Sequence, residues 1–197
     1  DGSEFPYELN ATFYGALSDK KNEKLGDARF LCSQAIALAM KGIPAIYFHS
    51  LCGTENFLEG VQETGHNRTI NRRKWKKAEL EDLLSDEKSN SGRIFEWYAR
   101  VLRRRSSCPA FHPDASQEVL DFGSEIFAFE RKSTDASQTI LCLFNFSSTE
   151  SEIKQRDVLL SYFPNAKAKD LIKGGELLFD SGTFILRPYQ ALWLSLN

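Results

Sequence analysis

The chain has 197 residues, of which 42% are hydrophobic and 26% are charged, and its formal net charge at pH 7 is −2. A chain of this length and composition buries a substantial core and holds one large or two small domains. Its nearly balanced charge gives no electrostatic basis for binding nucleic acid or an anionic membrane. No apolar run approaches the roughly 20 residues that cross a bilayer, and the opening Asp1-Gly2-Ser3-Glu4 lacks the pattern of a signal peptide. We therefore expect a cytoplasmic protein without nucleic-acid or membrane partners.

The stretch Gly42–Phe48 organises the first half of the chain. Before it, apolar residues occupy nearly the whole circumference from about Asp27 to residue 41, which predicts a largely buried helix with Asp27 as its N-cap. Gly42 can take the positive φ that ends a helix, and Pro44 prevents the helix from resuming. Ala45-Ile46-Tyr47-Phe48 shows no polar alternation, which predicts a strand covered on both faces. A helix followed by such a strand indicates an α/β fold, in which ligands bind beyond the carboxyl ends of the strands.

The remaining chain divides at about residue 109. Residues 49 to 76 are predicted to form a long loop, followed by helices over 78 to 84 and 92 to 105. The second helix has apolar residues at helical spacing and ends in three arginines, Arg103 to Arg105, which we interpret as a solvated terminus. Beyond residue 109, alternating segments separated by turn residues predict an antiparallel β-sandwich with one helical turn at 158 to 163. The predicted strands are 118–122, 125–131, 139–146, 184–186 and 191–196.

The cysteines and histidines give little indication of chemistry. Cys32, Cys52, Cys108 and Cys142 follow no Cys-x-x-Cys spacing, so we predict reduced and mostly buried thiols. His49 follows the predicted buried strand and is expected to be a hydrogen-bonded structural residue. Cys108 and His112 lack two further ligands at zinc spacing, so we expect no metal. The sequence contains no nucleotide-binding or nucleophile motif, and we expect no cofactor.

Two loops are candidate binding sites. Thr64 to Arg73 concentrates hydrogen-bond donors where an α/β fold builds its site, and a guanidinium suits paired hydroxyls or an anion. A solvated loop with basic residues before a helix explains this pattern equally well. The second candidate, Phe5 to Asn10, has an aromatic residue and a carboxylate that could stack on and bind a sugar. Spacing alone favours an ordinary loop there.

At these residues the sequence resembles the sucrose phosphorylase group of the α-amylase superfamily, glycoside hydrolase family thirteen. The resemblance rests on Gly42–Phe48, on Gly65–Arg72 with its core Arg68-Thr69-Ile70-Asn71-Arg72, and on Tyr7–Leu17. Pro188–Leu194 is similar to the last strand of that superfamily's C-terminal domain. The match covers nearly the whole chain.

The resemblance implies a fold of class α/β followed by all-β. Residues 1–108 would be the C-terminal part of the (β/α)8 catalytic TIM barrel, contributing its last βα units, and residues 109–197 a C-terminal antiparallel β-sandwich. Family members are retaining enzymes with a carboxylate nucleophile, a carboxylic general acid/base and a stabilising aspartate. All three would lie upstream, so we assign no catalytic residue here and expect the chain alone to be inactive. Its partner would be the missing N-terminal barrel portion.

The resemblance also implies substrates and binding residues. An intact enzyme would transfer glucose from an α-glucoside to phosphate, giving glucose 1-phosphate through a covalent glucosyl-enzyme. Arg68 matches the arginine that holds the glucosyl unit, and Tyr7 matches the tyrosine beside the acceptor. Glu8 stands where sucrose phosphorylases usually have glutamine, which favours a hydroxyl-rich acceptor and indicates a glucosylglycerate type of phosphorylase. A hydrolase of the superfamily and a non-catalytic carbohydrate-binding or structural fragment are the alternatives.

Overall fold

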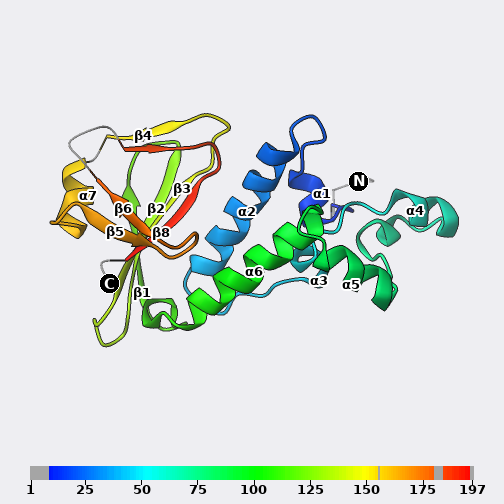
Figure 1. Cartoon of the computed structure of the whole chain (residues 1–197), viewed down its shortest axis with the longest axis horizontal. Coiled ribbons are helices and arrows are strands. Elements are labelled where there is room, and N and C mark those ends of the chain that lie inside the picture. The colour runs from blue at the N-terminus through cyan, green and yellow to red at the C-terminus, as the bar shows by residue number, and fades with distance from the viewer. Residues whose placement is uncertain (1–8, 155, 180–183, 196–197) are drawn as a thin grey trace, which may run out of the picture. The chain divides into compact units, whose positions relative to one another are not determined.

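The structure is a computed structural model, and it describes residues 9–154, 156–179 and 184–195. The chain divides into two compact units (Figure 1). Unit 1 comprises the chain up to Ser18 and Ile46–Glu96, and unit 2 comprises Asp19–Ala45 and Trp97–Asn197. Helix α6, Asn90–Ser106, begins in unit 1 and ends in unit 2. No helix within the described ranges is long and apolar enough to cross a membrane.

Unit 1 is built from short helices. Thr12 caps the first of them, because its hydroxyl accepts a hydrogen bond from the Gly15 amide at 2.9 Å. Thr12 is itself held by Asn56, whose Oδ1 accepts from the Thr12 amide at 2.8 Å. Before α6, the elements of unit 1 are α1 Phe13–Leu17, α3 Phe48–Leu51, α4 Leu58–Thr64, the 3-10 helix η1 Asn67–Asn71 and α5 Lys77–Ser85.

The predictions for residues 45 to 76 were partly wrong. Residues 43–47 form no strand, and Phe48 opens helix α3. A strand requires hydrogen bonds from a neighbour, and neither sheet of the described chain includes this segment. Its apolar side chains are accordingly uncovered, with Ile43 85% and Tyr47 56% exposed. The predicted long loop contains α3, α4 and η1, each too short to produce a clear apolar period.

Unit 2 places helix α2, Glu23–Ala39, against strands β3 and β8 of a sheet. The helix begins four residues before the predicted N-cap, because Asn22 rather than Asp27 caps it by accepting from the Leu25 amide at 3.2 Å. Its predicted burial is confirmed, since Phe30, Ala35 and Ala39 are fully inaccessible. Helix α6 also buries its apolar side as predicted, with Ile94, Trp97, Tyr98 and Val101 at most 8% exposed.

The β part of unit 2 is antiparallel, as predicted. One sheet has six strands in the order β1-β2-β3-β8-β5-β6, and β4 pairs with β7 in a second sheet. The predicted strands are confirmed within two residues over the described chain, whereas β4, β5 and β6 were not predicted. The elements after α6 are η2 Pro109–Phe111, β1 Ser116–Asp121, β2 Ile126–Lys132, β3 Thr139–Asn145, β4 Ser151–Ile153, α7 Arg156–Tyr162, β5 Lys167–Asp170, β6 Glu176–Leu178, β7 Phe184–Leu186 and β8 Ala191–Ser195.

Two arginines bind the carboxyl end of α2. Arg105 Nε donates to the Leu38 carbonyl at 2.7 Å, and Arg131 Nη1 donates to the Ala39 carbonyl at 2.6 Å. Cations stabilise the carbonyl end of a helix through its dipole. Arg105 is therefore a structural residue, and its prediction as a solvated helix end was wrong. The division into 1–108 and 109–197 remains a prediction, and in this chain α2 belongs to the same compact unit as the sheet.

Candidate binding pocket around Arg68

The loop predicted to bind a ligand forms a pocket of about 430 Å³ between α4 and η1 of unit 1. Two backbone hydrogen bonds fix the shape of the segment that lines the pocket. Gly65 ends α4 with a φ of 67°, and its amide donates to the Val61 carbonyl at 2.9 Å. The amide of Phe57 donates to the Ile70 carbonyl at 2.9 Å, which joins the residue before α4 to η1. The pocket is lined by Phe57, Gly60, Glu63, Thr64, His66, Arg68, Thr69, Arg72 and Lys74.

Small side chains hold the two helices close together. The Thr64 hydroxyl donates to the Gly60 carbonyl at 2.7 Å and lies 2.9 Å from the Thr69 hydroxyl. A Cβ at Gly60 would lie 2.1 Å from the Phe57 ring and 2.9 Å from the Thr69 methyl carbon, so only glycine fits at this crossing. The loop therefore has a packed structure of its own, and Arg68 stands on an ordered element.

The pocket wall is predominantly cationic. Arg68, Arg72 and Lys74 contribute positive charge, and Glu63 contributes the carboxylate. The Arg68 side chain is exposed, whereas an arginine bound to a sugar is expected to be covered. Guanidinium groups bind hydroxyls, phosphates and carboxylates through forked hydrogen bonds. The lining thus suits a polar or anionic ligand and offers one carboxylate for a hydroxyl.

Arg73 has a different role from Arg68 and Arg72. Its guanidinium lies 3.8 Å from the centroid of the Trp75 ring and 5.2 Å from that of Phe57, and its Nη2 is 2.8 Å from Glu79 Oε1. Stacking on two rings and pairing with a carboxylate fix the chain where η1 leads to α5. The three arginines look alike in the sequence, although the nearby Trp75 and Glu79 distinguish Arg73.

Ala11, which directly follows the second candidate loop, lies beside the first candidate loop. The Tyr47 hydroxyl donates to the Asn71 carbonyl at 3.2 Å, and Asn71 Nδ2 donates to the Ala11 carbonyl at 3.4 Å. The segment that follows Tyr7 and Glu8 therefore lies beside the end of η1. Tyr7 and Glu8 themselves lie outside the described residues, so of the three predicted binding residues the structure places only Arg68.

His49 and the four cysteines are buried. His49 is buried, with its Nδ1 3.1 Å from the Thr54 hydroxyl, as expected. Burial lowers the pKa of His49 and raises the pKa of each of the four cysteine thiols. All four cysteines are buried and unpaired. Within the described ranges, no group of three or more acidic, histidine or cysteine side chains is arranged to hold a metal ion.

Comparison with known sequences finds relatives along nearly the whole chain. It is 38% identical over 199 residues to a glucosylglycerate phosphorylase of Spirochaeta thermophila, covering 98% of this chain and 34% of the relative. The corresponding enzyme of Escherichia coli is 31% identical, with 98% and 33% covered. A sucrose phosphorylase of Streptococcus mutans is 23% identical over 79% of this chain and 30% of its own length. The chain therefore spans about a third of the length of these relatives. No family model matches it.

Solved structures share the fold. A mutant of the trehalulose synthase MutB aligns with 94% of this chain and 42% of its own, with a TM-score of 0.63 at 14% identity. A maltogenic amylase of S. marinus aligns with 89% of this chain and 20% of its own, with a TM-score of 0.54 at 19% identity. These likenesses concern the fold alone. The sequence relatives confirm the resemblance to a C-terminal portion of the phosphorylase group.

Proposed function

We propose that this chain, which resembles the sucrose and glucosylglycerate phosphorylases, forms the donor-binding C-terminal part of a retaining α-glucosyl-transferring phosphorylase. The observation that carries the proposal is the 38% identity over 98% of the chain to a glucosylglycerate phosphorylase. We further propose that residues 1–108 contribute the last βα units of a (β/α)8 barrel. The uncovered residues 43–47 would then become a strand once neighbouring strands supply hydrogen bonds.

The proposed reaction proceeds in two displacements at the anomeric carbon. A carboxylate attacks this carbon while the glycosidic bond breaks, and an acid protonates the leaving oxygen. A phosphate oxygen then attacks the same carbon and releases the carboxylate, while the deprotonated acid takes a proton from the phosphate; the product is α-glucose 1-phosphate with retained configuration. By the family resemblance, these carboxyl groups belong to chain outside this sequence. The residues of this chain bind and orient the substrates.

Arg68 is proposed to hold the glucosyl donor. It stands on η1 with its neighbours packed by Thr64 and Gly60, so the position of the loop is fixed without a ligand. All the lining residues of the pocket come from residues 57–74, and Arg68 is exposed. Chain outside this sequence would cover Arg68 in an intact enzyme. Arg72 and Lys74 add positive charge for an anionic substrate.

The acceptor is proposed to be rich in hydroxyls. Glu8 stands where sucrose phosphorylases usually carry glutamine, and a carboxylate accepts hydrogen bonds from hydroxyl groups. The relatives with the higher identities are named glucosylglycerate phosphorylases, which supports this choice. We therefore propose a glucosylglycerate-type α-glucoside as donor in the direction of phosphorolysis.

Substitution of Arg68 in an enzyme containing this segment tests the proposal. Arg68→Ala is expected to lower kcat/KM for phosphorolysis at least about a hundredfold, because two or more charge-assisted hydrogen bonds are lost. Arg68→Lys keeps the charge but loses the fork, so its loss should be smaller. Lys76→Ala is the matched control, since Lys76 is exposed and lies outside the pocket. An Arg68→Ala enzyme with wild-type kcat/KM would show that Arg68 is only a solvated residue.

The alternative is a non-catalytic carbohydrate-binding or structural fragment, because the chain spans only a third of its relatives' length. We expect the 197-residue chain to form no glucose 1-phosphate from glucosylglycerate and phosphate, since the family's three carboxylates are not assigned to it. Sustained product formation above a heat-treated control would contradict that assignment. If the intact mass of the native protein equals that of these 197 residues, the alternative function holds.

A further inference from the structure

Unit 2 contains a second pocket, of about 340 Å³, which shares no residue with the pocket around Arg68. One wall comes from α2 and α6, where Leu31 and Trp97 supply apolar surface. The turn after β5 and the turn between β7 and β8, which includes Tyr189, supply the other lining residues. Aromatic side chains in a pocket lining suit a ligand ring with apolar faces, such as a sugar.

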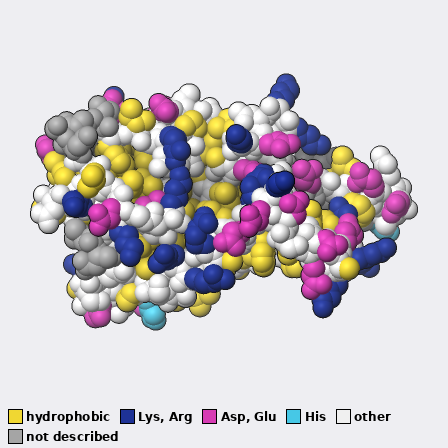
Figure 2. Space-filling view, in the orientation of Figure 1, with side chains coloured by type: hydrophobic (Ala, Val, Ile, Leu, Met, Phe, Trp, Pro, Cys, Tyr) yellow, Lys and Arg dark blue, Asp and Glu magenta, His cyan; other side chains and the backbone are white. Residues whose placement is uncertain are grey.

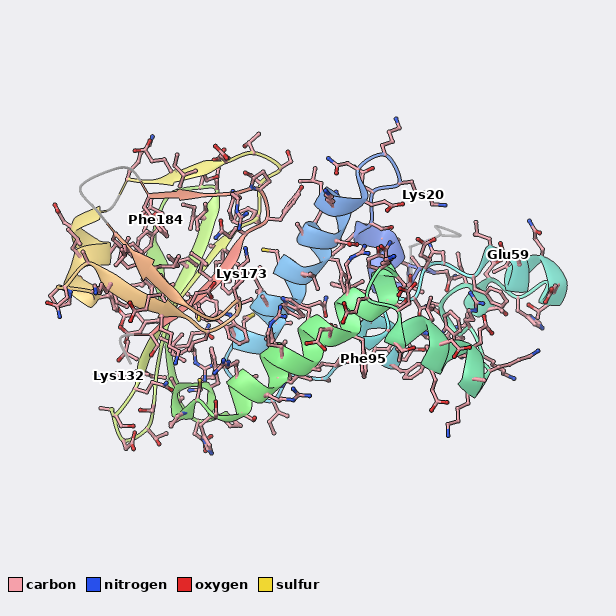
Figure 3. The ribbon with its side chains drawn as sticks, viewed as in Figure 1. Lys20, Glu59, Phe95, Lys132, Lys173 and Phe184 are labelled. Carbon is pink, nitrogen blue, oxygen red and sulfur yellow. The ribbon has the colours of Figure 1, made fainter. Side chains whose placement is uncertain are left out.

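Three cations from three separate elements line this pocket: Arg100 on α6, Lys173 after β5, and Arg187 after β7. None of them takes part in the ion pairs found among the described residues. Figure 2 shows Lys and Arg side chains gathered on the face of unit 2 where Figure 3 labels Lys173. Placing like charges together is unfavourable unless an anion joins them.

The charge balance around Lys173 agrees with this geometry. Burial lowers the pKa of Lys173 most, Arg187 and Arg100 lower it further, and the nearby Asp170 raises it. The Asp170 carboxylate is committed to the turn, because its Oδ1 accepts from the Ile172 amide at 2.9 Å. Arg100 Nε likewise donates to the Ile172 carbonyl at 3.3 Å, which leaves its outer nitrogens for a ligand. Lys173 therefore lies among two guanidinium groups and one carboxylate.

A strained turn presents Arg187 and Tyr189 to the pocket. The Gln190 amide donates to the Arg187 carbonyl at 3.0 Å, and Tyr189 has a φ of 52°, a conformation that costs a non-glycine residue about 1 kcal/mol or more. The fully buried Asn145 holds the turn, because its Nδ2 donates to the Arg187 carbonyl at 3.0 Å. Strained residues held by their surroundings occur preferentially at binding sites. The turn is therefore set in place before any ligand arrives.

We propose that this pocket binds a phosphorylated monosaccharide, with Arg100, Lys173 and Arg187 around the phosphate and the sugar ring in contact with the aromatic lining. Phosphate accepts forked hydrogen bonds from guanidinium groups and a point charge from an ammonium group. The choice of glucose 1-phosphate as the probe rests on the proposed function, whose product it would be. A pocket of this kind, outside the donor site, would make the enzyme responsive to its own product.

Calorimetric titration of the 197-residue chain with glucose 1-phosphate at low salt tests the proposal. We expect saturable binding that weakens at least tenfold in the variant Lys173→Gln/Arg187→Gln. The matched control is Lys20→Gln/Lys132→Gln, which removes the same charge at two exposed positions of unit 2 and should bind like the wild type. Thermal unfolding verifies that both variants fold. Binding of inorganic phosphate that is weaker than binding of glucose 1-phosphate, together with no binding of glucose, would show that the pocket contacts both the phosphate and the sugar.

Three outcomes would overturn the proposal: no saturable binding by the wild-type chain, equal binding by the pocket variant and its control, or binding abolished by Arg68→Ala instead. The last outcome places the anion in the pocket between α4 and η1. The proposed function is tested by phosphorolysis kinetics, which the variant Lys173→Gln/Arg187→Gln does not enter, so the two proposals fail separately.

Discussion

Replacement of Arg131 is expected to destabilise unit 2 more than any exposed arginine would. The side chain is fully buried in strand β2, and all its hydrogen bonds in the described structure go to backbone carbonyls. Nη1 donates to Ala39 at 2.6 Å, Nη2 to His112 at 2.9 Å and Nε to Ser116 at 3.1 Å. One guanidinium therefore joins the end of α2, the chain after η2 and strand β1. Burial lowers the pKa of Arg131, and the group remains charged because arginine titrates far above neutral pH.

The size of the effect follows from these three bonds. Hydrogen bonds to a charged group contribute about 1.5–3 kcal/mol each. Burying the guanidinium charge has a desolvation cost, and removing the charge avoids that cost, which offsets part of the loss. Methionine at position 131 fills most of the volume but leaves three carbonyls without donors. We expect a net loss of about 3–5 kcal/mol in the free energy of unfolding. Since a domain is typically stable by about 5–15 kcal/mol, this is a large fraction of the total.

Urea denaturation followed by the fluorescence of Trp193 measures this loss. Trp193 is fully buried, and its ring centroid lies 4.6 Å from that of Phe111, which packs near Arg131. Replacing Trp75 and Trp97 with phenylalanine in every sample isolates the signal. Arg104→Met is the control, because Arg104 is exposed and should change stability by less than about 0.5 kcal/mol. A loss for Arg131→Met as small as that of the control would refute the reasoning.

Three further predictions concern unit 1 and helix α2. Burial lowers the pKa of His49, so its contribution to stability is present above about pH 6.5 and is lost as the pH falls through the lower folded-state pKa. His49→Gln should therefore make the melting temperature less dependent on pH between about pH 5 and 7. Gly60→Ala should lower the free energy of unfolding by about 1–3 kcal/mol and make the loop sensitive to protease, because the new Cβ meets the Phe57 ring. Gly65→Asn should keep the loop intact, since asparagine tolerates the αL conformation of Gly65. Protease resistance of Gly60→Ala equal to that of the wild type would contradict this. Asn22→Ala should lower the stability measured by thermal unfolding by about 1 kcal/mol, and Asn22→Ser should lower it less. An unchanged stability of Asn22→Ala would mean that Asn22 does not cap α2.

The sequence alone determined the features that depend on near neighbours along the chain. The apolar spacing of α6 located its buried side, and alternation with turn residues located β2, β3, β7 and β8. The donors of the loop at Arg68 were recognisable as a group, because they are adjacent in sequence and η1 keeps them together. The spacing of these residues alone did not distinguish a binding loop from a solvated loop. The family resemblance indicated that the loop binds a carbohydrate.

Tertiary structure decided the features whose partners lie far away in the chain. Residues 45–48 have the composition of a buried strand, yet they form none because strand formation depends on a neighbouring strand and the described sheets provide none beside them. Arg105 and Arg131 carry no sequence mark of their roles, since the Ala39 carbonyl that Arg131 binds is 92 residues away. The cationic pocket of unit 2 likewise joins residues from α6, the β5 turn and the β7–β8 turn. Hydrogen bonds and charge depend on distance in space, and only the folded chain sets that distance.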